Sequence, residues 1–560
     1  MAVLIRIARV RVRTPESPIC CGSLKVGMTQ LSQEPSRDDK MSISAQPSIL
    51  ERSADSSAPT TNVIEAGKPD LDPLDTRRVS WLLCVLVFGF YLFVLVILTF
   101  HGESYLLRDP DVYWHIAIGQ KIWQTGSLPW VDQFSHTFQG QPWIAQEWLA
   151  QLALFGAYSL GGWGGVVLLS ASTLAATYAL LFLVLSRKMR LTVAIGVSGV
   201  AYALSMQHLI ARPQIFVDPL TILWVAGLVR AVERKASPSL LLLPIMVLWT
   251  NLHAGFTFGL ALGAIIGAEA FFGSEPGARL RTAFHWAVFL SAAVIAACIT
   301  PYGFHSFLAT FAVVRGNEAL NYVTEWQPLT LYPLGVQELF LYGLLFLALY
   351  YGAKVPFWRL ISLCMVVYMM FSYLRFASLF AMVAPILLAG PLTEQFPFLR
   401  LANQLEMARN FFVFVRRHFR MAAYSVYALL AGSVVLLGAF APSVVPKSNI
   451  TPAGAVDYMI KNRLSGNVYN FYNFGGYLIF RGIKTFVDGR TDQLFLGGFL
   501  TRLFDAVIKH PKNYIPLLIE YRVSIAMVVP DSMESQELGR SSDWEKLYSD
   551  KDAELYQRRR

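Results

Sequence analysis

The feature that most constrains this chain is a series of apolar runs, each about the 20 residues that a helix needs to cross a bilayer. The first run extends from Val79 to Phe100. Further runs begin near Trp163, Leu191, Ile215, Ser239, Gly255, Ala283, Gln337, Phe357, Phe376 and Met421. Only 15% of the 560 residues are charged, against about a quarter in soluble domains. The pattern predicts a polytopic α-helical membrane protein with about 11 transmembrane helices.

The Lys and Arg content of the loops indicates which side of the membrane each loop faces. Arg77 and Arg78 precede the first run, and basic clusters recur in alternate loops, as at 187–190 and 400–420. By the positive-inside rule, we expect a multi-pass protein of the inner (plasma) membrane with a cytoplasmic N-terminus and an extracytoplasmic C-terminus. The net charge of +10 therefore reports topology and does not indicate a nucleic-acid partner.

The runs divide the chain into three regions. Residues 1–76 are polar and lack periodicity, so we expect a disordered cytoplasmic segment. Residues 77–441 hold the spans, with a large first extracytoplasmic loop at 101–160. Residues 442–560 contain short β-like segments between helical stretches, namely NVYNFY (467–472), KTFVDGR (484–490) and VSIAMVV (523–529), which predicts a small soluble extracytoplasmic α/β domain with a parallel sheet.

The N-terminal residues bear on two points, the presence of a signal peptide and the position of the start. The opening MAVLIRIARVRVR is basic but has a short apolar core and no clear cleavage site, so we expect no signal peptide. Either Met1 or Met41 could be the true start.

The cysteines show no metal-type spacing and predict neither a disulfide framework nor a zinc site. They are Cys20, Cys21, Cys84, Cys298 and Cys364.

Unusual polar clusters recur in the loops that are expected to be extracytoplasmic. They are RDPDVYWH (108–115), ARPQ (211–214), TNLHAG (250–255), TPYG (300–303), TEWQP (324–328) and SYLRF (372–376). Because every second loop of a multi-pass protein lies on the same side of the membrane, we expect these clusters to converge on one extracytoplasmic cavity.

The first cluster contains the strongest candidate residues. Asp109 suits an N-cap, Pro110 the first helical position and Asp111 the first turn, so helix capping alone is one interpretation. Asp111 and His115 would share a helix face. A carboxylate beside an imidazole can orient it, share a metal with it or act as a general base. We favour a catalytic role for these residues in addition to capping.

Five further candidates lie beside apolar runs. Glu147 is a second candidate acid where the first loop returns to the membrane, with surface solvation as the alternative. Arg212 and Arg375 could bind a phosphate through bidentate contacts or snorkel to lipid headgroups. His253 and Glu325 could bind substrate or hold helices together as buried polar groups.

The C-terminal region adds one weaker motif. The segment DGRTD (488–492) follows the apolar stretch KTFV, and the pair Gly475-Gly476 precedes both. A loop after a strand is where open α/β sheets place ligands. The dipeptide Asp-Gly is equally typical of a simple turn, which is the interpretation we favour.

A cytoplasmic N-terminus, a first span and a long extracytoplasmic loop bearing Asp109 and Asp111 resemble the GT-C class of integral-membrane glycosyltransferases. That class includes protein O-mannosyltransferases, aminoarabinose transferases and oligosaccharyltransferase catalytic subunits. The resemblance covers roughly residues 79–440. It implies transfer of a sugar from a polyprenyl-phosphate donor to a glycan, lipid or protein acceptor in the cell envelope. The tail lacks a WWD-type oligosaccharyltransferase motif, which argues against asparagine glycosylation.

The resemblance also implies roles for the candidates. Asp109 or Asp111 would be the base that activates the acceptor, or a ligand for a divalent metal, Mg or Mn. Arg212 and Arg375 would hold the lipid phosphate that leaves. Two other classes stay open: a transporter or flippase of a lipid-linked saccharide, and a non-catalytic envelope assembly protein. A transporter would carry polar residues deep within several spans, whereas the acids here gather at one edge.

Overall fold

The computed structural model describes residues 73–101, 105–314, 322–329, 335–400 and 444–559, together with Tyr424, Ala428 and Gly432. The predicted disordered segment therefore lies almost wholly outside the described residues. The predicted last span, which begins near Met421, also lies outside them apart from these three isolated positions.

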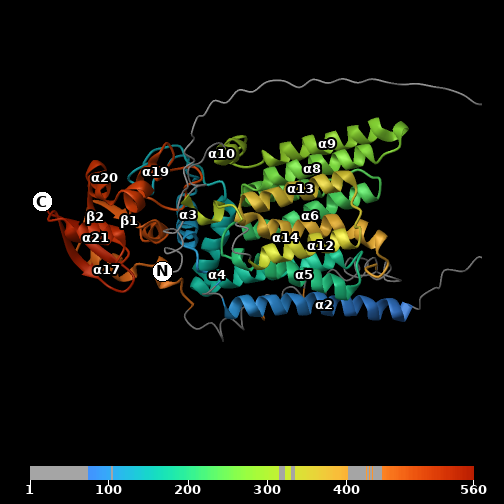
Figure 1. Ribbon diagram of the computed structural model, residues 1–560, viewed down its shortest axis with the longest axis horizontal. Coiled ribbons are helices and arrows are strands. Elements are labelled where there is room, and N and C mark those ends of the chain that lie inside the picture. The colour runs from blue at the N-terminus through green and yellow to red at the C-terminus, as the bar shows by residue number, and fades with distance from the viewer. Residues whose placement is uncertain are drawn as a thin grey trace, which may run out of the picture. The chain divides into compact units, whose positions relative to one another are not determined.

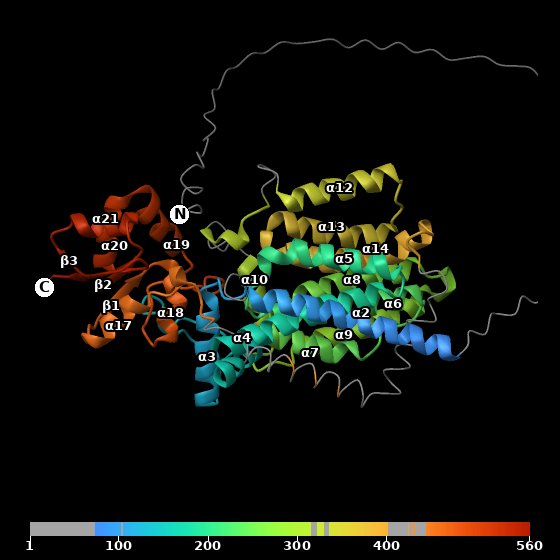
Figure 2. The same cartoon turned by 90° about the horizontal axis from the view of Figure 1, so that it is seen from below.

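Long apolar helices run side by side through the larger part of the molecule (Figures 1 and 2). Within the described residues, five helical segments are long and apolar enough to cross a membrane. They comprise α2 (Pro73–Phe100), α4 (Trp148–Leu185), α6 (Gln214–Glu233), α9 (Arg279–Ala297) and α14 (Ala377–Gln395). Shorter helices are α5 (Leu191–Ser205), α7 (Leu242–Leu252), α8 (Phe256–Phe272), α10 (His305–Val314), α12 (Val336–Tyr350) and α13 (Phe357–Ser372). The protein is a helical membrane protein; the total of about 11 spans stays a prediction.

Helix α4 begins at Trp148, inside the predicted loop 101–160. Gly161 and Gly162 leave helical geometry, and the apolar run that the sequence places near Trp163 continues beyond this kink. The first part of α4 packs against α3 (Asp111–Thr125). Residues 126–147, which join α3 to α4, are called the 126–147 loop below.

Some buried polar groups in the bundle have partners from neighbouring helices. The indole N–H of Trp224 in α6 donates to the carbonyl of Gly259 in α8 at 2.8 Å. At the end of the bundle where α6 terminates, Arg359 of α13 donates to the Glu269 carboxylate at 2.9 Å and to the Leu387 carbonyl at 3.0 Å. Such pairing is required where charges lie among apolar helices.

The C-terminal region holds a mixed four-stranded sheet in the order β1-β2-β4-β3. Strand β1 (Asn467–Asn470) is parallel to β2 (Val523–Val528), while β4 (Glu554–Arg558) is antiparallel to both β2 and β3 (Trp544–Ser549). The helices here are α17 (Ala453–Lys461), α18 (Gly475–Phe480), α19 (Phe499–Phe504), α20 (Tyr514–Glu520) and α21 (Met533–Arg540).

The prediction of a parallel sheet was wrong for all but one strand pair, and the predicted strand at 484–490 is not in the sheet. Its backbone bonds elsewhere: Thr485 N–H donates to the Phe134 carbonyl at 3.0 Å, and His136 N–H donates to the Thr485 carbonyl at 3.0 Å. The segment is therefore tied to the 126–147 loop.

Candidate active site

Segments that are distant in the sequence meet at the end of the bundle where α6 begins, which we call the site end. Ala211 N–H donates to the Leu106 carbonyl at 2.9 Å, which joins the start of α6 to the approach to α3. Leu374 N–H donates to the Gln327 carbonyl at 3.0 Å, which joins the start of α14 to residues 322–329. These backbone contacts bring the predicted polar clusters together.

The two aspartates of the DPD element are buried at the start of α3. The Asp109 carboxylate accepts a hydrogen bond from the Asp111 N–H at 2.9 Å through Oδ1. This contact caps the helix, as the sequence predicts, and it occupies one oxygen of Asp109. The second aspartate therefore has more of its carboxylate available than the first.

Arg212 lies among three carboxylates. Its Nη2 is 2.8 Å from Asp109 Oδ2 and 2.7 Å from Asp111 Oδ2. Its Nη1 donates to Glu325 Oε2 at 2.5 Å. The terminal donors of the guanidinium therefore already have carboxylate partners, and Arg212 organises the acids more directly than it could hold a phosphate.

This cluster contains acids with different proton affinities. Burial raises the pKa of Asp109 to about 7, although Arg212 opposes the rise. Burial likewise raises the pKa of Asp111. Burial also acts to raise the pKa of Glu325, but the charges of Arg212 and Arg375 outweigh it and lower that pKa. Near neutral pH, Glu325 is thus ionised, while Asp109 can exchange a proton.

A second cluster joins Glu147 to two histidines. His253 Nε2 is 3.4 Å from Glu147 Oε1, and His115 Nδ1 is 3.9 Å from Glu147 Oε2. His253 Nδ1 accepts from the Gly255 N–H at 2.9 Å, which assigns the ring proton to Nε2. No hydrogen bond or ion pair joins His115 to Asp111, so the predicted pair shares a helix without direct contact.

Proximity suggests ion pairs in this second cluster, but the protonation states indicate neutral groups. Burial and then Asp492 raise the pKa of Glu147 to about 8. Burial and the charges of Arg375 and Arg212 lower the pKa of His253 to about 3. Burial, Arg212 and His253 also lower the pKa of His115. At neutral pH the cluster is therefore a set of neutral hydrogen-bonding groups suited to hydroxyls.

Among the residues that the structure describes, Arg375 makes no ion pair with a carboxylate, although the charges of Glu325, Glu147 and Asp492 act on it. Its guanidinium carbon lies 4.4 Å from the centre of the Trp326 ring, a cation–π contact. Within the described part of the chain, no hydrogen bond or ion pair engages its donors. Arg375 therefore presents a stacked cation with donors available to a ligand.

The C-terminal region contributes to the same site, which the sequence did not indicate. A Cβ at Gly489 would lie 2.6 Å from Asp111 Cγ, and a Cβ at Gly476 would lie 3.1 Å from the Pro110 carbonyl carbon. Asp492 influences the pKa of Glu147, and Asp111 influences that of Tyr472. The DGRTD segment is thus part of the site and more than a simple turn.

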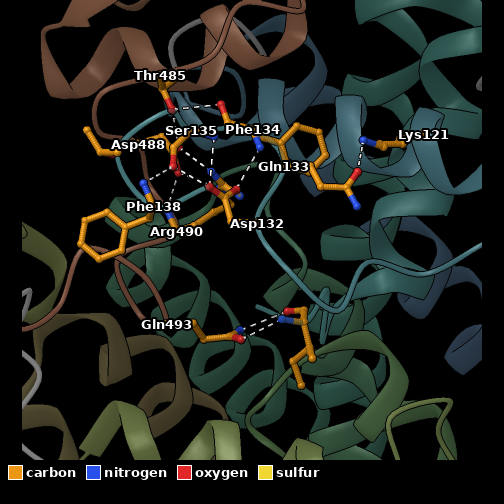
Figure 3. Close-up of polar contacts among 12 residues, drawn as sticks. Lys121, Asp132, Gln133, Phe134, Ser135, Phe138, Thr485, Asp488, Arg490 and Gln493 are labelled. Atoms are coloured by element: carbon orange, nitrogen blue, oxygen red, sulfur yellow. Dashed lines mark hydrogen bonds and ion pairs between the residues drawn. The ribbon is translucent and has the colours of Figure 1, made fainter. Parts of the chain in front are cut away.

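A buried ion cluster holds this segment in place (Figure 3). Arg490 Nη1 lies 2.5 Å from Asp132 Oδ1 in the 126–147 loop. The same guanidinium contacts Asp488 through Nε and Nη2, each at 2.8 Å. All three side chains are 0% exposed, so the cluster is a fixed structural connection.

A groove of about 470 Å³ lies next to Glu147 in the sequence and in space. Its lining is mostly apolar and comprises Trp148, Leu149, Val247, Leu248, Asn251, Ile299, Thr300 and Pro301. Asn251 fixes one wall, because its Oδ1 accepts from the Trp148 indole at 2.9 Å and its Nδ2 donates to the Ile299 carbonyl at 2.9 Å.

The predicted metal does not fit the arrangement of Asp109 and Asp111. Among the residues that the structure describes, no group of three or more His, Cys, Asp and Glu side chains could hold a metal ion. Arg212 contacts the oxygens that would coordinate the cation and supplies positive charge there. A metal at this position stays a prediction from the sequence, and no chemical step below relies on it.

No family model and no curated protein matches the chain. Several solved structures are similar to it, among them the following three. An apo oligosaccharyltransferase from Archaeoglobus fulgidus has a TM-score of 0.47 and 11% identity, covering 81% of this chain and 69% of that one. AglB from the same organism, in complex with an inhibitory peptide and a dolichol-phosphate, has a TM-score of 0.46 and 13% identity, covering 78% and 69%.

The third is ArnT from Cupriavidus metallidurans bound to undecaprenyl phosphate, with a TM-score of 0.43 and 14% identity, covering 83% of this chain and 97% of that one. These proteins are GT-C glycosyltransferases, the class that the sequence resembles.

Proposed function

We propose that the protein is an inverting glycosyltransferase that moves a sugar from a polyprenyl-phosphate donor to an acceptor hydroxyl. One juxtaposition carries the proposal: the buried carboxylates of Asp109 and Asp111, whose pKa values burial raises, share the site end with Arg375, which stacks on Trp326. A transfer of this kind needs both a proton acceptor and a positive charge for the departing phosphate.

Asp111 is the proposed base. Its Oδ2 contacts Arg212, whereas Asp109 uses Oδ1 for the Asp111 N–H and Oδ2 for Arg212. The acceptor oxygen forms a bond to the anomeric carbon as its proton passes to Asp111. The bond between that carbon and the phosphate oxygen breaks, and its electron pair leaves with the polyprenyl phosphate.

Arg375 is the proposed phosphate ligand. A guanidinium held against an aromatic face loses little freedom when it binds an anion, and its fork matches two phosphate oxygens. The neutral cluster of Glu147, His115 and His253 would bind sugar or acceptor hydroxyls. The apolar groove beside Trp148 would accept the first isoprene units.

The experiment uses the full chain in nanodiscs with synthetic polyprenyl-phosphate sugars and follows release of polyprenyl phosphate. Asp111→Asn should reduce release by about 10²–10⁴-fold. Unchanged release at normal protein levels would reject the role of Asp111. Accumulation of intact donor on the opposite face of proteoliposomes, without release, would indicate a flippase instead.

A further inference from the structure

The Asp132–Arg490–Asp488 cluster is saturated by its own chain. Asp132 also accepts from the N–H groups of Phe134 at 2.9 Å and Ser135 at 3.1 Å. Asp488 also accepts from the Thr485 hydroxyl at 2.7 Å. The cluster therefore leaves little room for a ligand. It connects the 126–147 loop to the DGRTD segment.

Aromatic rings close the remaining faces of the Arg490 guanidinium. Its carbon lies 5.2 Å from the centre of the Phe134 ring and 5.0 Å from that of Trp143. Both rings belong to the 126–147 loop, as does Asp132. The loop thus surrounds a side chain that comes from the C-terminal region, and it fixes the backbone on either side of Arg490.

Gly489 is the residue between the two charged members, and it faces the site. A Cβ there would come within 2.6 Å of Asp111 Cγ and closer still to Asp111 Oδ1. Its φ is not positive, so the need for glycine here is a need for space. The backbone that the ion cluster fixes is therefore the backbone that limits where the Asp111 carboxylate can lie.

We propose that Arg490 is a positioning residue for Asp111, acting through the Gly489 backbone. By binding Asp132 and Asp488, Arg490 holds Gly489 against the Asp111 carboxylate and keeps that carboxylate on Arg212. The C-terminal region thereby completes the site. The importance of this positioning for catalysis rests on the proposed role of Asp111 as the base.

The test follows the protonation of Asp111 without any substrate. The full chain in nanodiscs is treated with dicyclohexylcarbodiimide, which labels protonated buried carboxyls, across about pH 5 to 9. Mass spectrometry of peptides gives the midpoint of labelling at Asp111. In Gly489→Ala the added Cβ displaces the carboxylate from its position beside Arg212, and a weaker contact with that cation should let labelling persist to a pH about one unit higher.

Matched variants separate positioning from stability. Arg490→Met should shift the midpoint in the same direction, and Arg490→Lys should shift it less. Gly277→Ala, at a glycine with open space for a Cβ, should leave it unchanged. If Arg490→Met does not fold, Gly489→Ala decides, because it leaves the ion pairs of Arg490 intact.

A wild-type midpoint in Gly489→Ala, or in a folded Arg490→Met, would overturn the proposal. The labelling involves no donor or acceptor, so it is independent of the transfer reaction. A shifted midpoint together with full transfer by Asp111→Asn would leave the positioning in place and reject the role of Asp111 as base.

Discussion

The guanidinium of Arg212 lies 2.7 Å from the carboxylate of Asp111. The sequence assigns these two residues separate roles, phosphate ligand and base, but in the folded chain they bind each other. Arg212 therefore sets the charge and orientation of the acids. In the proposed transfer, Arg375, which stacks on Trp326, would supply the positive charge that a departing phosphate requires.

Removing the charge of Arg375 should weaken phosphate binding. Arg375→Gln should raise the Kd for undecaprenyl phosphate in nanodiscs by about tenfold or more, since a charge-assisted contact is worth about 1.5–3 kcal/mol. The Kd of Arg375→Lys should lie between those of the wild type and Arg375→Gln, because lysine keeps the charge but lacks the planar guanidinium that can bind two phosphate oxygens. Native mass spectrometry gives the Kd values. Arg502→Gln, at an exposed ion pair, is the control, and equal binding by both glutamine variants would contradict the assignment.

Glu147 should make stability depend on pH. Burial, reinforced by Asp492, raises its pKa from 4.5 to about 8. The folded chain therefore holds a proton that the unfolded chain releases near pH 4.5, and stability should fall as pH rises from 4.5 to about 8. Glu147→Gln should flatten the slope of Tm against pH in this window. Identical slopes would show that Glu147 is ionised in the folded protein.

Breaking the buried ion cluster should destabilise the protein strongly. Arg490→Met removes the cation of the cluster and leaves the carboxylates of Asp132 and Asp488 buried without it, at an expected cost of about 3–5 kcal/mol. Glu520→Gln breaks an exposed pair with Arg502 and should cost about 0–1 kcal/mol. Thermal unfolding of the two variants in detergent compares them directly. Equal losses of Tm would mean that the cluster is not a structural connection.

Helix positions followed from the sequence because an apolar run of bilayer length leaves the backbone few alternatives. Every predicted run before Met421 coincides with a described helix. The residues that meet at the site end were also among the candidates from the sequence, since acids and arginines beside apolar helices are costly without a role; their roles stay predictions. The capping contact of Asp109 was predictable for the same local reason.

Contacts between distant segments were beyond the sequence pattern. Nothing local to ARPQ indicates that Arg212 binds Asp111, and nothing local to DGRTD indicates a partner in Asp132. The stretch KTFVDGR has the composition of a strand, but Thr485 bonds to the 126–147 loop instead of the sheet. The availability of Arg375 also depends on which carboxylates reach it, and only the folded chain determines that.

In the proposed reaction, Asp111 accepts the proton of the acceptor while Arg375 holds the phosphate. Release and binding of polyprenyl phosphate by Asp111→Asn and Arg375→Gln, measured in the same nanodiscs, separate these two roles. Asp111→Asn should lose release by about 10²–10⁴-fold but still bind undecaprenyl phosphate, whereas Arg375→Gln should lose binding. Full release by Asp111→Asn, or wild-type binding by Arg375→Gln, would contradict the proposed reaction.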